Sequence, residues 1–312
     1  MRRPVPAVFF GSGAFAVPIL EALADAPETT LLAVVTAPPR PAGRQQLPME
    51  TPVAQRAGAR GLPIHGDAAV AATAELIVLA DYGRLLPAAV VDAPRHGALN
   101  LHPSLLPRWR GATPVARAIA AGDPVTGVSL MRMDAGLDTG PLVAQRETAI
   151  AADETTPELE ARLATMAAAL LLDRLGPWLR GEAQARPQPP EGVSVARQFH
   201  RVDGRVDVDR PAAELARQVR AFQPWPGSFV DTSVGRLVLW QARPGPAAAT
   251  GGVRPGALVA SGSGLALVVG DGLLLLEGVQ LAGGRRMTGA ELLRGHPGLV
   301  GTVVGPVGEG SR

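Results

Sequence analysis

Residues 100–111 read Asn-Leu-His-Pro-Ser-Leu-Leu-Pro-Arg-Trp-Arg-Gly, and the rest of the chain is organised around them. They begin as the end of an apolar strand. Because side chains alternate along a strand, Asn100 and His102 share one face while the leucines beside them can face the core. Two prolines and an Arg-Trp-Arg cluster follow, which cannot continue a central strand and predict a rigid loop at a sheet edge. Open α/β sheets place their functional sites there, although an Asn-x-His pair taken alone is more often a hydrogen-bonded core histidine.

The first half of the chain alternates apolar strands with helical stretches. A buried strand at 7–10 leads through a glycine turn at 11–13 into a helix that reaches about Ala24. Further strands are expected at 31–35 and 76–80. This alternation predicts an α/β fold with a doubly wound, mostly parallel sheet.

The glycine turn nearly matches a dinucleotide-binding fingerprint, with Gly11, Gly13 and Ala16 at the required spacing. The acidic residue that would hold a ribose is missing, because the next strand ends in Thr-Ala-Pro-Pro at 36–39. We therefore interpret the glycines as a tight strand-to-helix turn. A nucleotide-binding oxidoreductase remains an alternative that the missing acid disfavours.

The second half of the chain has a different pattern. Residues 182–193 are rich in proline and show no periodicity, which is typical of a linker. Short apolar runs separated by glycines follow, and this spacing predicts a small β-barrel. The expected organisation is a catalytic domain at 1–181, a linker at 182–204 and a smaller β-barrel domain at 205–312.

Composition restricts the chemistry. The 312 residues include no cysteine, and all 30 basic residues are arginines, which excludes disulfides, thiolate catalysis and lysine Schiff bases. The five histidines show no metal-ligand spacing, and we expect no metal. Without an apolar run long enough for a membrane span, or the hydrophobic stretch of a signal peptide, we expect a cytoplasmic protein with no membrane association. We separately expect a monomer. The net charge of +2 does not support a uniformly basic surface for nucleic acid.

Residues 99–114 resemble the signature of the folate-dependent formyltransferase family. Further segments in family order are 10–12, 41–44, 82–87, 133–140 and 220–226, so the resemblance spans most of the chain. It implies a Rossmann-like formyltransferase fold. It also implies transfer of the formyl group of 10-formyltetrahydrofolate to the α-amino group of methionyl initiator tRNA, for translation initiation.

Formyl transfer passes through a tetrahedral intermediate whose oxygen becomes negative. The side-chain amide of Asn100 can donate a hydrogen bond to that oxygen, and His102 can move the proton between the two nitrogens. A carboxylate would orient the imidazole and stabilise its protonated form. The resemblance assigns this role to Asp138, with Asp134 as the second choice, although a turn-capping aspartate beside Gly140 is the alternative for Asp138.

The resemblance also suggests where the two substrates bind. It implies that the reduced folate is lined by Ser104, Leu105, Leu106 and Pro107, whereas the neighbouring Arg-Trp-Arg cluster can also be an ordinary solvated loop. We expect tRNA to contact the proline-studded loop at 38–52 through Arg40 and Arg44, and also the domain at 205–312. Gln45 and Gln46 stand where relatives often carry basic residues, and Asp81 stands where they more often carry a small one.

Other functions stay open at this point. One is another 10-formyltetrahydrofolate-dependent formyltransferase or hydrolase, acting on a small amine or on water. Another, from a different class, is a non-catalytic RNA-binding module. The second domain and the arginine-bearing loop favour tRNA over a small amine.

Overall fold

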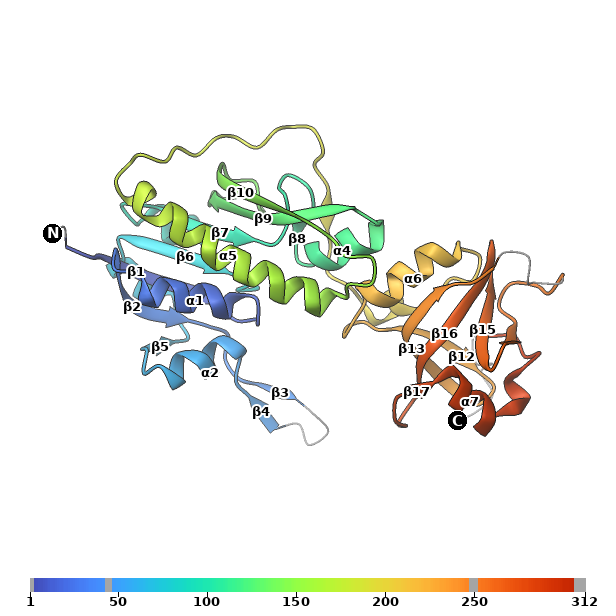
Figure 1. Ribbon diagram of the computed structural model, residues 1–312. Coiled ribbons are helices and arrows are strands. Elements are labelled where there is room, and N and C mark those ends of the chain that lie inside the picture. The colour runs from blue at the N-terminus through green and yellow to red at the C-terminus, as the bar shows by residue number, and fades with distance from the viewer. Residues whose placement is uncertain (1–2, 43–46, 247–251, 306–312) are drawn as a thin grey trace. The chain divides into compact units, whose positions relative to one another are not determined.

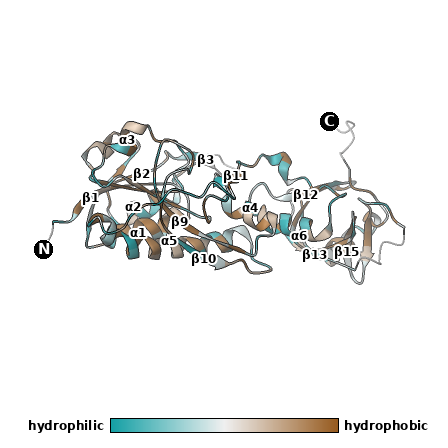
Figure 2. Cartoon of the chain, turned by 90° about the horizontal axis from the view of Figure 1, so that it is seen from above, coloured by the Kyte–Doolittle hydropathy of each residue, from teal (hydrophilic) through white to brown (hydrophobic). Residues whose placement is uncertain are grey.

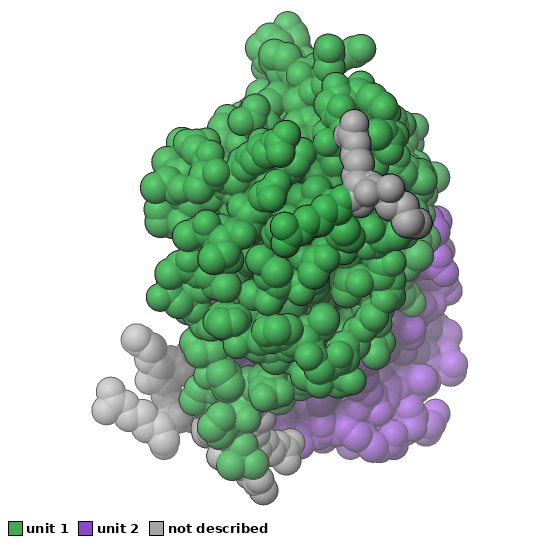
Figure 3. Space-filling view, turned by 90° about the vertical axis from the view of Figure 1, so that its left-hand side faces the viewer, with its two compact units in different colours: residues 1–115, 125–150, 158–197 green, residues 116–124, 151–157, 198–312 purple. Residues whose placement is uncertain are grey.

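The computed structural model describes residues 3–42, 47–246 and 252–305, and these form two compact units. The first unit comprises residues 1–115, 125–150 and 158–197, and the second comprises 116–124, 151–157 and 198–312 (Figure 3, green and purple). Arg44 belongs to 43–46, outside the described residues. No described helix combines the length and the apolar character that crossing a membrane requires.

The first unit is built on a seven-stranded sheet with the order β10-β9-β7-β6-β1-β2-β5 (Figure 1). Its strands are β1 Val5–Gly11, β2 Thr29–Val35, β5 Ile64–His65, β6 Leu76–Ala80, β7 Ala98–His102, β9 Val125–Arg132 and β10 Leu142–Ala149. The pairs among β7, β6, β1, β2 and β5 are parallel, whereas β9 and β10 pair antiparallel. The expected mostly parallel α/β sheet is confirmed.

Helices cover both faces of this sheet. They are α1 Ala16–Asp25, α2 Pro52–Ala59, α3 Ala88–Asp92, α5 Thr156–Leu179 and the 3-10 helix η1 Ala68–Thr73. Helices α1 and α5 lie on one face, and α3 lies on the other (Figures 1 and 2). Helix α1 buries Ile19, Leu20 and Leu23, which share one side of a helix, and Figure 2 shows the mixed brown and teal colouring of such amphipathic helices.

Two segments without apolar periodicity have more structure than the sequence suggests. The loop at 38–52 contains a short antiparallel pair, β3 Arg40–Ala42 and β4 Leu47–Met49. The proline-rich segment after α5 pairs with the first unit: Arg186 bridges to Leu142, and β11 Val195–Ala196 lies parallel to β8 Arg110–Gly111. The first unit therefore extends to Arg197.

The second unit is an antiparallel sheet with helices against it, as expected for a separate β domain. It contains most of α4 Pro114–Ala121. Its other elements are η2 Arg201–Gly204, α6 Ala212–Ala221, β12 Ser228–Thr232, β13 Gly235–Pro244, β14 Leu258–Ser261, β15 Gly264–Val269, β16 Gly272–Leu281, β17 Met287–Thr288, α7 Gly289–Gly295 and η4 Pro297–Leu299.

The two edge strands of this sheet, β12 and β14, are joined through the segment at 301–305. Gly301 donates its backbone N–H to Leu258 in β14, and Gly305 donates its own to Asp231 in β12. Leucines and valines of the strands pack with Leu215 and Val219 of α6 in one core. The ring of hydrogen bonds gives the unit a barrel-like closure and satisfies edges that would otherwise be open.

Candidate active site

Asn100 and His102 lie on β7, near the middle of the sheet. Leu79 of β6 pairs with Asn100, while Ser129 of β9 pairs with His102. Both side chains belong to buried residues, with 6% and 5% of their surface exposed. Their neighbours Leu99 and Leu101 are buried as well, because this strand is covered on both faces. The alternation expected from the sequence is present, and it directs an amide and an imidazole to the same side.

Asp138 comes from the loop after β9 and meets both residues. Its Oδ1 accepts a hydrogen bond of 3.4 Å from Asn100 Nδ2, and its Oδ2 lies 3.7 Å from His102 Nδ1. The backbone N–H of Gly111 also donates to Oδ2, at 2.8 Å. Residues from the end of β7, from the segment after it and from the loop after β9 thus meet at one place, the carboxyl end of β7.

The contacts of the imidazole fix the roles of its two nitrogens. His102 Nε2 lies 2.9 Å from the backbone oxygen of Trp109. Because a carbonyl oxygen can only accept, Nε2 carries a proton, and Nδ1 of the neutral ring is left as an acceptor that faces Asp138. When the ring takes up a second proton, each nitrogen has an oxygen acceptor. The site can therefore hold a proton on His102 during a reaction.

The amide of Asn100 has unused hydrogen-bonding capacity. Nδ2 has two hydrogens and uses one toward Asp138, while Oδ1 is buried and has no partner among the described residues. A buried amide oxygen without a partner is uncommon in a folded protein. This arrangement leaves the second hydrogen of Nδ2 for a substrate, while Oδ1 stays buried.

Asp134, the second choice for the carboxylate, is occupied within its own loop. Its Oδ1 accepts hydrogen bonds from the Gly136 backbone N–H, at 3.0 Å, and from the Thr139 hydroxyl, at 2.7 Å. Asp138 has the left-handed φ of 52°, and Gly140 follows where a Cβ would lie 1.9 Å from the oxygen of Arg132. The loop thus uses Asp134 for its own turn and turns Asp138 toward the imidazole.

The expected folate-lining residues form a tight turn beside this cluster. Ser104, Leu106 and Pro107 are buried, and Leu105 is partly exposed. The turn is held by Ser129, whose hydroxyl donates to Ser104 O at 2.6 Å and accepts from the Leu106 N–H at 3.0 Å. Gln145 donates to both Ser129 Oγ and Leu106 O. Sequence reasoning missed Ser129 and Gln145, which lie on strands with no motif to mark them.

Two acids with raised pKa values, Asp81 beside the glycine turn and Glu160 of α5, were not recognised as a pair from the sequence. Burial raises the pKa of Asp81, at the end of β6, to about 6. Burial, with added repulsion from Asp81, raises the pKa of Glu160 of α5 to about 7. Among the described residues, no three histidine or acidic side chains are grouped closely enough to hold a metal ion.

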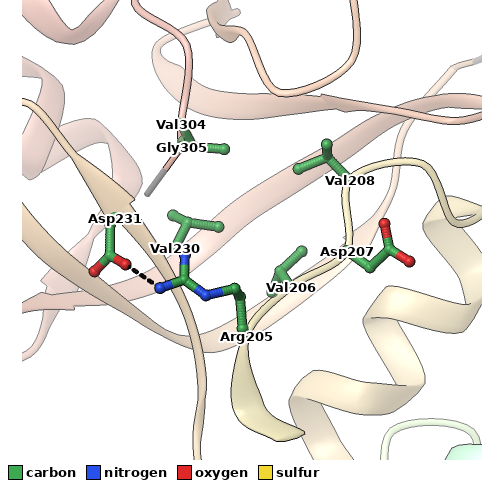
Figure 4. Close-up of a pocket in the computed structure, with 8 residues that line it drawn as sticks. All are labelled: Arg205, Val206, Asp207, Val208, Val230, Asp231, Val304 and Gly305. Atoms are coloured by element: carbon green, nitrogen blue, oxygen red, sulfur yellow. Dashed lines mark hydrogen bonds and ion pairs between the residues drawn. The ribbon is translucent and has the colours of Figure 1, made fainter. Parts of the chain in front are cut away.

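The residues expected to bind tRNA are only partly placed. Arg40 is exposed on β3, and Arg44 lies outside the described residues. In the second unit, a cavity of about 380 Å³ is bordered by Arg205 and Asp231, which form an ion pair (Figure 4). The rest of its lining is Val206, Asp207, Val208, Val230, Val304 and Gly305.

An amide donor, a histidine and an aspartate converge at the carboxyl end of a strand in a mostly parallel sheet. This arrangement defines an α/β enzyme equipped for acyl transfer. A family model described as formyl transferase matches residues 6–175, and one described as formyl transferase, C-terminal domain, matches residues 199–297. The chain belongs to the formyl transferase family.

Curated relatives agree over nearly the whole length. The methionyl-tRNA formyltransferase of Paracoccus denitrificans is 42% identical over 299 residues, which cover 92% of this chain and 96% of the relative. That of Paramagnetospirillum magneticum is 41% identical over 309 residues, which cover 96% of this chain and 99% of the relative.

Solved structures with lower identity share the fold. An N-formyltransferase from Helicobacter canadensis, in complex with folinic acid and dTDP-3-aminofucose, aligns with a TM-score of 0.66 at 15% identity, covering 88% of this chain and 99% of that one. HypX from Aquifex aeolicus, in complex with tetrahydrofolic acid, aligns at 0.63 and 16% identity, covering 93% of this chain and 47% of that one. Both of those proteins hold a folate derivative.

Proposed function

We propose that this protein transfers the formyl group of 10-formyltetrahydrofolate to the α-amino group of methionine esterified to initiator tRNA. The observation that carries the chemistry is the convergence of Asn100, His102 and Asp138 at the carboxyl end of β7. The acceptor is inferred from relatives near 40% identity that are named methionyl-tRNA formyltransferases and match almost end to end.

The reaction exchanges one carbon–nitrogen bond for another. The uncharged amino group attacks the formyl carbon, a carbon–nitrogen bond forms, and the formyl oxygen becomes negative. The free hydrogen of Asn100 Nδ2 donates to that oxygen and lowers the energy of the intermediate. The intermediate then collapses with cleavage of the bond to N10 of the folate.

One proton moves during this exchange. The attacking nitrogen becomes acidic as its new bond forms, whereas the departing N10 needs a proton to leave. In our proposal His102 accepts the first proton at Nδ1 and returns one to N10, so that no net proton is consumed. Asp138 faces the protonated ring, and the oxygen of Trp109 holds the opposite nitrogen in place.

We propose that the reduced folate lies along residues 104–107. Ser129 and Gln145 hold this turn from behind, so that its shape exists before the ligand arrives. A preformed surface reduces the conformational entropy that binding would otherwise cost. Leu105, which is partly exposed, is the apolar side chain of the turn with surface available to the ligand.

We propose that the tRNA is held by Arg40, Arg44 and the second unit. There Arg205 and Arg236 both bond to Asp231 and both lie over the ring of Phe229. Burial alone would raise the pKa of Asp231, but the hydrogen bonds from the two arginines hold it below its ordinary value. The two guanidinium groups exceed the charge of Asp231 by one, and this positive charge, which Asp207 beside the cavity partly offsets, is suited to a phosphate.

The test is formylation of methionyl initiator tRNA with 10-formyltetrahydrofolate, with uncharged tRNA, free methionine and no acceptor in parallel reactions. The proposal predicts that formyl groups accumulate on charged tRNA alone. Equal formylation of free methionine would show that the acceptor is a small amine and that tRNA is not required. Release of tetrahydrofolate at the same rate without any acceptor would identify a hydrolase.

A further inference from the structure

The proline-rich segment at 186–196, which we call the strap, lies along the active-site loops. At one end Arg186 exchanges two backbone hydrogen bonds with Leu142, of 2.7 and 2.8 Å. At the other end Ser194 accepts from the Trp109 N–H through its hydroxyl, and its backbone oxygen accepts from the Arg110 N–H. The strap is therefore anchored on both sides of the loop that carries Asp138.

Gln188 lies between these anchors and uses its whole side-chain amide. Its Nε2 donates to the backbone oxygens of Asp138 and Gly140, at 2.8 Å in both cases. Its Oε1 accepts from Arg110, at 3.2 Å from Nε and 2.7 Å from the terminal nitrogen. One amide thus connects the loop of the carboxylate to the segment after the histidine strand.

These contacts act on a backbone that needs support. Asp138 has a φ of 52°, a left-handed conformation that costs energy for residues other than glycine, although aspartate tolerates it better than most. The two carbonyl oxygens held by Gln188 belong to the peptide units Asp138–Thr139 and Gly140–Pro141, so Gln188 restrains the backbone at Asp138 and just beyond it. Gly111, whose N–H donates to Asp138 Oδ2, follows Arg110, and the guanidinium of Arg110 donates to the same amide.

We propose that Gln188 is a positioning residue: it holds the Asp138 carboxylate against His102 and Gly111, and it makes the strap a part of the active site. The inference rests on the proposed role of Asp138 in formyl transfer. It places a functional residue in a segment that separates the two domains in the sequence.

The main variant is Gln188→Met, which keeps the length of the side chain and removes all of its hydrogen bonds. We expect kcat for formylation to fall by about tenfold to 10²-fold, since small displacements of a catalytic group have effects of that order. KM for the folate donor should change by less than about twofold, because none of the hydrogen bonds of Gln188 among the described residues goes to residues 104–107. Gln184→Met, just before the strap, is the matched control, since the Gln184 side chain is exposed and has no hydrogen bond among the described residues.

A double-mutant cycle distinguishes positioning from general stability. If Gln188 acts through Asp138, Gln188→Met in an Asp138→Asn background should reduce kcat by less than about twofold further. A loss that is equally large in both backgrounds would refute the proposal. If Gln188→Met is too unstable to assay, Gln188→Glu takes its place. It keeps an acceptor for Arg110 but places a carboxylate against two carbonyl oxygens, and it should show the same loss of kcat.

A second measurement does not depend on the reaction. The Gly111 amide should exchange with deuterium faster in Gln188→Met than in Gln184→Met, because its acceptor on Asp138 is displaced. Unchanged exchange would refute the positioning role even if the acceptor substrate proved to be different. If the wild-type protein fails to formylate methionyl-tRNA but Gly111 exchanges faster in Gln188→Met, the proposed function is contradicted and the positioning role of Gln188 is not.

Discussion

Replacing Asn100 by alanine should separate catalysis from folding. The side chain makes one hydrogen bond, a long one of 3.4 Å to Asp138, and its buried Oδ1 has no partner among the described residues. Removing an unsatisfied buried acceptor relieves about 1–3 kcal/mol of desolvation cost, which offsets the small cavity that the substitution leaves. The free energy of unfolding of Asn100→Ala should therefore lie within about 1 kcal/mol of the wild type.

The loss of activity should be far larger. A fixed donor to a developing oxyanion contributes about 10²–10³ in rate, or about 2.7–4 kcal/mol of barrier. We expect kcat of Asn100→Ala to fall by this factor while the affinity for reduced folate stays nearly constant. The two effects differ because the free hydrogen of the amide is used in the transition state and not in the resting protein.

Asn100→Asp provides a sharper comparison. It keeps the shape of the side chain but places an oxygen where a donor faced Asp138 at 3.4 Å. Two like charges at that distance repel by about 5 kcal/mol at an effective dielectric constant of about 20. A carboxylate at this position also repels the oxyanion. Asn100→Asp should therefore be both less stable and less active than Asn100→Ala.

Single-turnover formylation of charged tRNA and chemical denaturation of the same preparations test this reasoning. Near-normal turnover of Asn100→Ala would remove the amide from the chemistry. A parallel loss of stability and activity in Asn100→Ala would instead identify Asn100 as a residue of the fold, and the proposed role would be refuted.

Three further changes test other parts of the molecule. Ser129→Ala removes the hydroxyl that holds the turn at 104–107 and should weaken reduced-folate binding about tenfold, measured by calorimetric titration; an unchanged affinity would contradict the role of Ser129. Arg40→Ala should lower the slope of log affinity for tRNA against log salt by about 0.7–0.9, with folate binding as the control. Glu160→Gln tests the acid of α5: because burial, with the charge of Asp81, raises the pKa of Glu160 to about 7, the folded chain keeps a proton that the unfolded chain loses above about pH 4. Wild-type stability should therefore decline from about pH 4 to 7, and thermal unfolding should show Glu160→Gln to be more stable than the wild type at pH 8 but not at pH 4.

The regular elements could be predicted because their side chains repeat with a period. Strand β7 shows the alternation that places Asn100 and His102 on one side, and α1 shows the helical spacing of its buried leucines. The pair β3–β4 could not be predicted in this way. Pro41 lies opposite Pro48 in its register, and a two-stranded ribbon tolerates prolines that a central strand would not.

The site was predictable only where a motif or the resemblance marked it. Asp138 is 38 residues from Asn100, and its nearness to His102 depends on the pairing of β9 with β7. The backbone oxygen of Trp109, which holds the imidazole, has no signal in the sequence because every residue has such an oxygen. Gln188 had none either, since the aperiodic proline-rich run around it is typical of a linker.

The structure adds an argument against the dinucleotide-binding alternative that the sequence alone could not supply. In a nucleotide-binding turn the free N–H groups and the helix N-terminus attract a phosphate. Here the N–H groups of Ser12 and Gly13 both donate to the backbone oxygen of Asp81, at 2.9 and 3.3 Å. The Asp81 carboxylate also covers Gly13, where an added Cβ would lie 1.6 Å from Oδ2. Burial raises the pKa of Asp81 to about 6, which still leaves the carboxyl mostly ionised at neutral pH. The turn that resembles a phosphate site therefore carries negative charge, which repels a phosphate.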